Sequence, residues 1–425
     1  MVHPHRQHPG LPPTRPPHRL HRHSRTRHRT HPRHPPHRNR YARRGPLRPC
    51  GDRRASVCPP CAETYRADTY QLIKAGLTGG KGIPTTVAGH PAVFATLTAP
   101  SFGPVHTRHV NPKTGKVAPC RMRRNIQRCP HGKLLVCTQR HTENHPSLGR
   151  PLCLDCYDHA RHVVWNAWAG ELWRRTTIAI NRALRKDEKA YGIKLRISYG
   201  KVAEYQRRGV VHFHALIRLD RRDPEDPDAI LAPPARITAE GLALLVEEAA
   251  HVTHFQTPGY ADTGHTWDIE WGRQIDVRPV GNLGTGQITS EAVAAYLAKY
   301  ATKATETTGL PPTGRMTAEA AEHYSDAHTH LGRLIAYAFQ LGTPPSDWTT
   351  DEQQADWHAT WGRSGAGPTC SASAATSPPR AAATPPPTKP CARSAAPGTA
   401  TPVPTGADAT PTASRSNTST TTRRR

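Results

Sequence analysis

Two long segments that lack the residues of a hydrophobic core, one at each end of the chain, confine any fold to the middle. Residues 1–49 are dominated by His, Arg, Pro and Thr, and residues from about 364 to 425 by Ala, Pro, Ser and Thr. Such segments bury too little apolar surface to offset the entropy lost on ordering, so they are predicted to be disordered. About 44–362 remain to fold, which suits two intertwined units or one elaborated domain.

The C-terminal segment also allows a test of its reading frame. The stretch "PTCSASAATSP" (368–378) can be back-translated so that a shifted frame encodes His-Met-Leu-Gly-Phe-Arg-Gly-His-Phe-Pro. That phrase looks more like folded protein than the one in frame. A frameshift near 362–367 is therefore one hypothesis for the residues that follow, and the basic head of the chain either has a similar origin or is a genuine basic tail.

The charge balance points to a polyanionic partner. The formal net charge is +26 and the isoelectric point is about 10.2, with basic clusters at 120–129 and 173–186 inside the foldable part. Nucleic acid is the commonest polyanion for such a protein. The sequence has no apolar run long enough for a membrane helix and no apolar segment of a signal peptide. We therefore expect a cytoplasmic protein whose cysteines stay reduced or bind metal.

The hydrophobic pattern of the middle predicts helices that alternate with strands. Helices are expected at 62–77, 158–189, 234–255 and 290–306, and strands at 92–103, 193–206, 209–219 and 268–280. Ser290 suits the N-cap of the last helix, and Glu291 suits its first turn. Strands separated by helices with long connections predict an α+β sheet domain.

The stretch "EYQRRGVVHFHALIRLD" (204–220) contains two histidines one residue apart. Residues two apart in a strand project to the same face, so His212 and His214 point together while Phe213 enters the opposite core. An isolated pair of this kind is more often two hydrogen-bonded strand histidines. Two imidazoles on one face can also hold one divalent ion.

A third ligand for such an ion depends on the turn before the histidines. With a three-residue loop or a bulge near 207–209, Glu204 lies opposite His212 and shares its face. With a two-residue loop, Tyr205 takes that place instead. A carboxylate, two imidazoles and a phosphate oxygen would suit Mg²⁺ or Mn²⁺ acting as a Lewis acid.

Candidate nucleophiles lie on the last predicted helix. In "AAYLAKYATK" (294–303), Tyr296 and Tyr300 are four residues apart and so lie on one helix face. Lys299 and Lys303 each follow a tyrosine by three residues, near enough to steady a phosphate or assist loss of the phenolic proton. Alone, this pattern is more often a helix with packing tyrosines and solvated lysines. Joined to an upstream histidine pair, it forms a coherent site for phosphodiester transfer.

Eight cysteines fall in the foldable part. Cys58 with Cys61, and Cys153 with Cys156, are C-x-x-C units, which in a reducing compartment favour tetrahedral zinc. Cys120, Cys129 and Cys137 offer the ligands of a second site, together with Cys50 or a histidine such as His131 or His141. We expect one or two structural zinc ions that anchor long insertions and shape a basic surface facing DNA. Reduced buried thiols are the alternative.

Two further histidine pairs have the spacing of metal ligands but no supporting residues around them. They are His251 with His254, and His328 with His330. We expect all four to be solvated side chains on helices or loops.

A family resemblance joins these motifs. "HFH" on a strand followed by Tyr-x-x-Lys on a helix resembles the HUH endonucleases, which nick single-stranded DNA, and "FATLTAPS" (94–101) resembles their first motif. More narrowly, "CGDRRASVCPPCAETYRADTYQLIKAGL", "FATLTAPSFGPVH", "EYQRRGVVHFHALIRLD" and "AAYLAKYATK" look like the RepSA-type replication initiators of actinomycete plasmids. The resemblance covers about 50–362, and the shifted-frame phrase resembles what such proteins carry near their C-terminus.

The resemblance implies an HUH-like antiparallel sheet flanked by helices, with zinc-binding insertions and disordered ends. The corresponding divisions are a basic segment (1–49), a cysteine-rich zinc-binding region (50–160) interleaved with the first strand (92–103), a nickase core (161–345) and a C-terminal segment (346–425).

The resemblance also implies rolling-circle initiation. A tyrosine attacks an origin phosphate that a bound Mg²⁺ or Mn²⁺ polarises, and this forms a 5′-phosphotyrosine and frees a 3′-hydroxyl. Single-tyrosine relatives favour Tyr300 over Tyr296 as the first nucleophile, and two-tyrosine relatives use both alternately. The implied partners are single-stranded or extruded origin DNA and the host helicase and polymerase, with no membrane.

Two other functions are compatible with the same residues. Some insertion elements encode HUH transposases that combine cysteine-rich regions with a histidine pair and paired tyrosines. A non-enzymatic, zinc-containing DNA-binding regulator is the second alternative, in which the histidines and tyrosines are structural.

Overall fold

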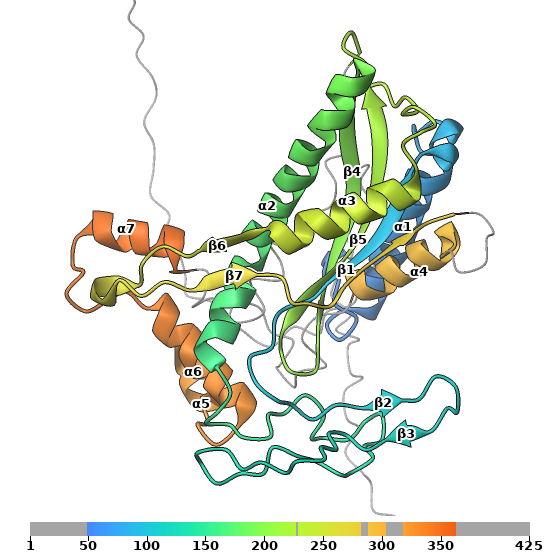
Figure 1. The fold of residues 1–425 in the computed structure, drawn as a ribbon. Coiled ribbons are helices and arrows are strands. Elements are labelled where there is room, and N and C mark those ends of the chain that lie inside the picture. The colour runs from blue at the N-terminus through green and yellow to red at the C-terminus, as the bar shows by residue number, and fades with distance from the viewer. Residues whose placement is uncertain (1–48, 227, 282–287, 303–317, 363–425) are drawn as a thin grey trace, which may run out of the picture. The chain divides into compact units, whose positions relative to one another are not determined.

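A four-stranded antiparallel sheet forms the centre of the protein. The computed structural model describes residues 49–226, 228–281, 288–302 and 318–362. The strands are β1 (Ala92–Leu97), β4 (Lys194–Tyr205), β5 (Val211–Arg222) and β8 (Ile275–Pro279), in the spatial order β4-β5-β1-β8 (Figure 1). Strand β1 thus pairs with β5 on the side opposite β4, and β8 pairs with the other side of β1.

Helices and short strands surround this sheet. The helices are α1 (Pro59–Thr78), α2 (His159–Tyr191), α3 (Ala239–Val252), α4 (Ser290–Ala301), α5 (Ala318–Tyr324), α6 (His330–Gly342) and α7 (Asp351–Thr360), with short 3-10 helices η1 (Thr85–Gly89) and η2 (Ala261–Thr263). The short strands are β2 (His109–Val110), β3 (Val117–Ala118), β6 (His254–Gln256) and β7 (Asp268–Glu270). The predicted α+β class is confirmed, although several elements are shorter than the hydrophobic pattern suggested.

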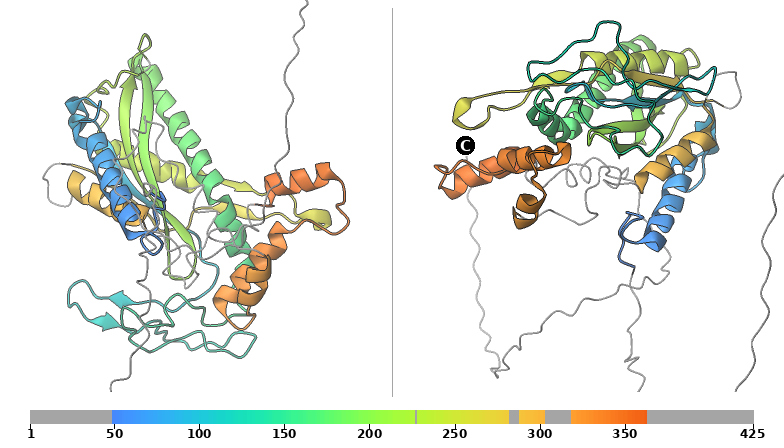
Figure 2. Two further views of the ribbon diagram at one scale, coloured as in Figure 1. Left: turned by 180° about the vertical axis from the view of Figure 1, so that it is seen from behind. Right: turned by 90° about the horizontal axis from the view of Figure 1, so that it is seen from below.

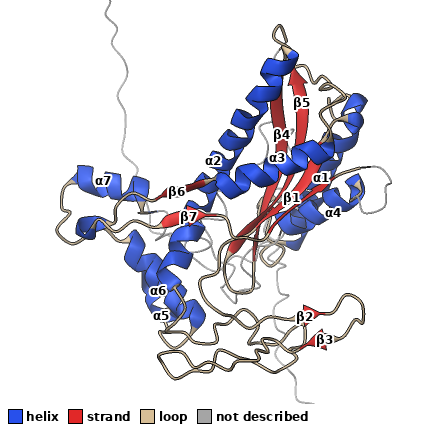
Figure 3. Ribbon diagram, in the orientation of Figure 1, coloured by secondary structure: helices blue, strands red, loops and turns tan. Residues whose placement is uncertain are grey.

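Successive side chains along β5 point to opposite faces of the sheet, so the hydrophobic core is divided between the two faces. Phe213 and Ile217 face α2 and α3 and are buried with Leu172 of α2. Phe94 of β1 faces the other way and is buried with Leu297 of α4 in a core shared with α1. Helices therefore cover both faces, with α2 and α3 on one and α1 and α4 on the other (Figure 3).

Helix α4 begins one residue earlier than an N-cap at Ser290 would place it. The side chain of Thr289 accepts a hydrogen bond from the backbone N–H of Ala292, so Thr289 is the N-cap. Ser290 is the first helical residue and is buried, so the expectation that Ser290 caps the helix is wrong. Glu291 lies in the first turn, where a carboxylate complements the helix dipole.

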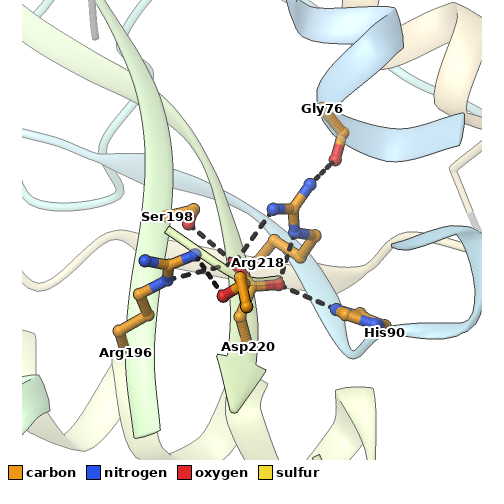
Figure 4. A network of polar contacts seen from close by, with 7 residues as sticks. Gly76, His90, Arg196, Ser198, Arg218 and Asp220 are labelled. Atoms are coloured by element: carbon orange, nitrogen blue, oxygen red, sulfur yellow. Dashed lines mark hydrogen bonds and ion pairs between the residues drawn. The ribbon is translucent and has the colours of Figure 1, made fainter. Parts of the chain in front are cut away.

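A buried ion-pair network fastens the far end of β5 to its neighbours (Figure 4). Asp220 accepts hydrogen bonds from Arg218 at 2.7 and 2.9 Å and from Ser198 at 2.7 Å, and lies 2.8 Å from Nδ1 of His90. Arg218 also donates to the carbonyl oxygen of Gly76 in α1. The network joins α1, β4, β5 and the segment before β1 on the same face of β5 as the histidine pair.

A long insertion, residues 104–157, connects β1 to α2 and contains only β2 and β3 as named strands. Its loops lie together beyond one end of the sheet, as the views from the front and from behind show (Figure 1 and Figure 2). Gly149, with φ of 84°, passes so close to Arg207 that an added Cβ would lie 2.5 Å from the Arg207 carbonyl carbon. The insertion is therefore packed directly against the turn of the β4-β5 hairpin.

Candidate active site and metal clusters

The turn between β4 and β5 decides which side chain faces the histidines. Glu204 pairs with His212 across the hairpin, and the Gln206 N–H donates to the Val210 carbonyl at 2.8 Å. The intervening loop has three residues and ends at Gly209, whose φ of 83° is a conformation that favours glycine. This is the loop length at which Glu204 shares the face of His212.

Three potential ligand atoms converge on that face. Oε2 of Glu204 lies 3.0 Å from Nε2 of His212 and 3.0 Å from Nε2 of His214, and the two Nε2 atoms are 3.1 Å apart. Phe213 and Tyr205 point to the opposite face and are buried in the core against α2. The alternation of side chains along two paired strands is sufficient to produce this cluster.

The second nitrogen of each imidazole also has a neighbour. Nδ1 of His214 lies 3.1 Å from the Thr96 hydroxyl on β1, and Nδ1 of His212 lies 3.3 Å from the side-chain amide of Gln206. Phe94 stacks on the His214 ring with an interplanar angle of 2°. These contacts orient both rings with Nε2 toward Glu204, as outer contacts orient metal-binding histidines in general.

The electrostatics of the cluster favour an ionised carboxylate at Glu204 and a neutral imidazole at His214. Burial opposes ionisation of Glu204, but hydrogen bonds from His212 and His214 outweigh it and lower the pKa of Glu204 to about 2. Burial lowers the pKa of His214, although the hydrogen bond between His214 and Glu204 raises it in part. A neutral imidazole and an ionised carboxylate are the forms in which these side chains bind metals.

Both tyrosines of α4 lie against the histidine pair. The Tyr296 hydroxyl is 3.2 Å from Nε2 of His214, and the rings of Tyr296 and Tyr300 are 4.5 Å apart. The Tyr300 ring centroid lies 5.6 Å from that of His214. Burial, with contributions from Tyr300 and Glu204, raises the pKa of Tyr296, so its phenol is held protonated.

Of the two lysines in the Tyr-x-x-Lys units, Lys299 lies within the described residues. Lys299 is exposed, and its Nζ lies 5.5 Å from the centre of the Tyr300 ring. It therefore contacts the second tyrosine, although the sequence spacing had associated it with Tyr296. Lys303 lies outside the described residues.

The cysteines and several histidines assemble into three groups whose potential ligand atoms all lie within 4.8 Å of one another. Group A is His106, Cys120, Cys137 and His141; group B is Cys129, His131, Cys153 and Cys156; group C is Cys50, Cys58 and Cys61. The two C-x-x-C units fall in groups B and C. The expectation that Cys120, Cys129 and Cys137 share one site is wrong, because Cys129 joins Cys153 and Cys156 in group B. His106 was not anticipated, and only its place upstream of Cys120 could have suggested it.

The two remaining histidine pairs differ in burial. His251, His254 and His328 are exposed, as expected, although His254 lies on strand β6 and not on a helix or loop. His330 is buried, so the expectation of a solvated side chain is wrong there. Its Nδ1 lies 3.1 Å from Nε2 of His159, and its Nε2 donates to the Arg208 carbonyl at 2.9 Å. This contact docks α6 on the start of α2 and on the turn of the β4-β5 hairpin.

Among the described residues, no helix is both long and apolar enough to cross a membrane.

Comparison with known proteins agrees with the motifs that the site brings together. The family model for RepSA, described as a replication initiator protein of pSAM2, matches residues 15–373. A replication initiator protein from Streptomyces ambofaciens is 45% identical over 296 residues, which cover 67% of this chain and 58% of that relative. The chain thus spans less than two thirds of the length of this curated relative. No solved structure matches. The chain belongs to the RepSA family of replication initiator proteins.

Proposed function

We propose that this protein initiates rolling-circle replication of a plasmid by nicking one strand of the origin and transferring that strand through a 5′-phosphotyrosine. The observation that carries the proposal is the convergence of the Glu204, His212 and His214 ligand atoms with two tyrosines of α4. These side chains come from the β4-β5 hairpin and from α4, in which Tyr296 lies 82 residues beyond His214, and all lie on one face of the sheet.

The donor set fits a hard divalent ion such as Mg²⁺ or Mn²⁺. The three separations of 3.0, 3.0 and 3.1 Å are close to the roughly 3.0 Å between adjacent ligands of an octahedral ion at about 2.1 Å. Tetrahedral zinc with nitrogen ligands would separate them by about 3.4 Å. Glu204, His212 and His214 would hold the ion, which when bound supplies Lewis-acid polarisation of the scissile phosphate.

A tyrosine of α4 serves as the nucleophile. Its oxygen forms a bond to phosphorus as the bond from phosphorus to the 3′ oxygen breaks. The phenolic proton is lost and the departing oxygen gains one, which leaves a 3′-hydroxyl as a primer and the 5′ phosphate joined to the tyrosine. Burial raises the pKa of Tyr296, so its phenol carries the proton before the attack. Lys299 supplies positive charge beside Tyr300 for the phosphate.

The positions of the two tyrosines suggest a division of roles. The Tyr296 hydroxyl lies directly at His214, which favours Tyr296 for the first attack, in contrast to the family preference for Tyr300. Tyr300 lies one helical turn further along the same face and is suited to the second transfer, which closes the round.

Covalent capture tests the proposal. Each chain is incubated with Mn²⁺ and an end-labelled single-stranded oligonucleotide from the origin, and the adduct is measured on a denaturing gel. We expect Tyr296→Phe to abolish the first adduct and Tyr300→Phe to reduce later strand transfer. Tyr337→Phe, which removes the hydroxyl of a partly exposed tyrosine on α6, is the matched control and should leave both steps unchanged.

Adduct formation that survives both tyrosine changes would refute the assignment. If the wild-type chain forms no adduct but binds the origin, the non-enzymatic regulator is the better description. Cleavage of transposon ends in place of a plasmid origin would identify a transposase.

A further inference from the structure

The insertion between β1 and α2 has no hydrophobic core of its own. The buried residues between 104 and 156 are Cys120, Cys129, His141, Gly149, Pro151 and Cys153. No Leu, Ile, Val or Met in this fully described stretch is buried. Regular structure is limited to the two-residue strands β2 and β3 and isolated bridges. Since most of the buried residues are potential metal ligands, apolar packing does not explain how this segment holds its shape.

The ligand atoms of group A are spaced as the corners of a zinc tetrahedron. Nδ1 of His106 lies 3.3 Å from Nε2 of His141, and the Cys120 and Cys137 sulfurs lie 3.8 and 3.5 Å from their nearest imidazole nitrogens. Tetrahedral zinc, with bonds of 2.0–2.1 Å to nitrogen and 2.3 Å to sulfur, requires about 3.4 Å between nitrogens and about 3.6 Å from nitrogen to sulfur.

Group B has similar spacing with a different donor set. Nδ1 of His131 lies 3.2 Å from the Cys156 sulfur and 3.8 Å from the Cys153 sulfur. These separations lie on either side of the tetrahedral value of about 3.6 Å, and Cys129 completes a set of three cysteines and one histidine. Both groups therefore supply four ligands, as closed structural zinc sites do.

The two groups alternate along the chain. The first ligand pair (His106, Cys120) belongs to group A and the second (Cys129, His131) to group B. The third pair (Cys137, His141) returns to group A and the fourth (Cys153, Cys156) to group B. Each loop between two consecutive pairs therefore joins a ligand of one group to a ligand of the other. Metal in both groups would fix both ends of each of these loops.

The surface of the insertion is strongly cationic. Its exposed basic residues are Arg108, Lys113, Lys116, Arg123, Arg124, Arg128, Lys133, Arg140 and Arg150, whereas its only acidic residues are Glu143 and Asp155. None of these basic side chains forms an ion pair with a carboxylate of the described residues. Unpaired cations on braced loops are available for phosphate contacts.

The composition favours double-stranded over single-stranded DNA. Proteins that bind single strands stack the bases on aromatic side chains, and residues 104–156 contain no Phe, Tyr or Trp. The loop between Cys120 and Cys129 instead exposes Met122 and Ile126 beside its arginines. Exposed aliphatic side chains among cations suit the sugars and thymine methyl groups of a duplex groove.

We propose that two zinc ions, one in group A and one in group B, brace residues 104–157 as a module that binds duplex origin DNA beside the nicking site. Origin DNA as the partner rests on the proposed function, whereas the zinc sites do not. Gly149 packs on the backbone of Arg207 at the hairpin turn, and Arg207 donates to Asn144 at 3.4 Å. A duplex held by the module is thereby positioned relative to Glu204 and His212 on the same hairpin.

Zinc content tests the metal sites. Zinc per full-length chain is measured by inductively coupled plasma mass spectrometry. Cys137→Ser with His141→Ala should remove about one equivalent, and Cys153→Ser with Cys156→Ser should remove another. His109→Ala changes an exposed histidine of the same insertion that belongs to neither group, and it should retain the full content. Unchanged zinc in both double variants would overturn the assignment.

DNA binding tests the surface in the full chain. Fluorescence anisotropy compares a duplex origin fragment with its single strand for Arg123→Ala/Arg124→Ala/Arg128→Ala. We expect duplex affinity to fall at least about tenfold at ~150 mM salt, with a salt slope lower by about 2 to 3. Zinc content and nicking of the single strand should be unchanged. The control Lys189→Ala/Arg222→Ala/Arg236→Ala removes the same charge from exposed positions outside both basic clusters and should bind as the wild type does.

The outcomes separate the two proposals. Duplex binding that is unaffected by the arginine changes, or equally weakened in the charge-matched control, overturns the duplex-binding module. Loss of single-strand affinity alone would instead assign the loop to single-stranded DNA and also overturns it. Absence of nicking by the wild-type chain contradicts the proposed function but leaves the duplex measurement interpretable.

Discussion

Asp220 is the buried counter-charge of Arg218, whose guanidinium donates to the Gly76 carbonyl of α1. Its carboxylate is fully buried and is shared among Arg218, Ser198 and His90. Burial opposes ionisation, but Arg218, with smaller contributions from His90 and Ser198, lowers the pKa of Asp220 below its ordinary value. Ionised Asp220 therefore stabilises the folded state above the ordinary pKa of about 4, and that contribution is lost as pH falls through the lower, folded-state pKa.

Replacing Asp220 tests this contribution. Asp220→Asn leaves the buried Arg218 guanidinium without its counter-charge, so we expect the free energy of unfolding at neutral pH to fall by about 3–5 kcal/mol. The difference from the wild type should shrink as pH falls below about 4. Urea denaturation at several pH values measures both effects. Glu248→Gln, an exposed carboxyl on α3, should change stability by less than about 0.5 kcal/mol. A pH-independent difference would contradict the role of ionisation.

At the scale of elements, the site is a contact between one hairpin and one helix. The β4-β5 hairpin brings Glu204 opposite His212, and α4 brings the tyrosines to His214 because its buried side packs on α1 and β1. The guanidinium of Arg53 also donates to the Ala301 carbonyl at the end of α4, at 2.9 Å. The position of α4 therefore depends on packing that the reaction itself does not involve.

Leu297→Ala tests that dependence. Leu297 is fully buried between the tyrosines along α4, so its truncation should cost about 2–5 kcal/mol of unfolding free energy. Because the cavity lies beneath the tyrosine face, adduct formation should also slow under conditions in which the variant is folded. Leu244→Ala, at a position of α3 that is 70% exposed, is the matched control. Equal effects of the two changes on stability would show that α4 is not anchored in this way.

For the whole molecule, we expect two classes of metal with separable effects. A hard ion at Glu204 and the histidines exchanges readily, whereas zinc held by thiolates is coupled to folding. EDTA at low concentration should stop adduct formation, and added Mn²⁺ should restore it while duplex binding persists. A zinc-selective chelator should abolish duplex binding, and zinc but not Mn²⁺ should restore it. Recovery of both activities by a single metal would contradict the separation.

The local periodicities were readable without the fold because they depend only on neighbours in the chain. The two-residue repeat placed His212 and His214 on one face, and the four-residue spacing placed Tyr296 and Tyr300 on another. The C-x-x-C units were recognisable for the same reason. The α+β class followed from the order of strand and helix patterns, although strand and helix ends did not, since capping and pairing partners set them.

The amino-acid sequence by itself determined the motifs, the charge and the class of fold. Only the tertiary structure decided that Tyr296 contacts His214, that His106 joins Cys120, and that His330 is buried. These contacts join residues from different elements or loops. Their formation depends on the path of the chain through the whole core, so no local pattern specifies them.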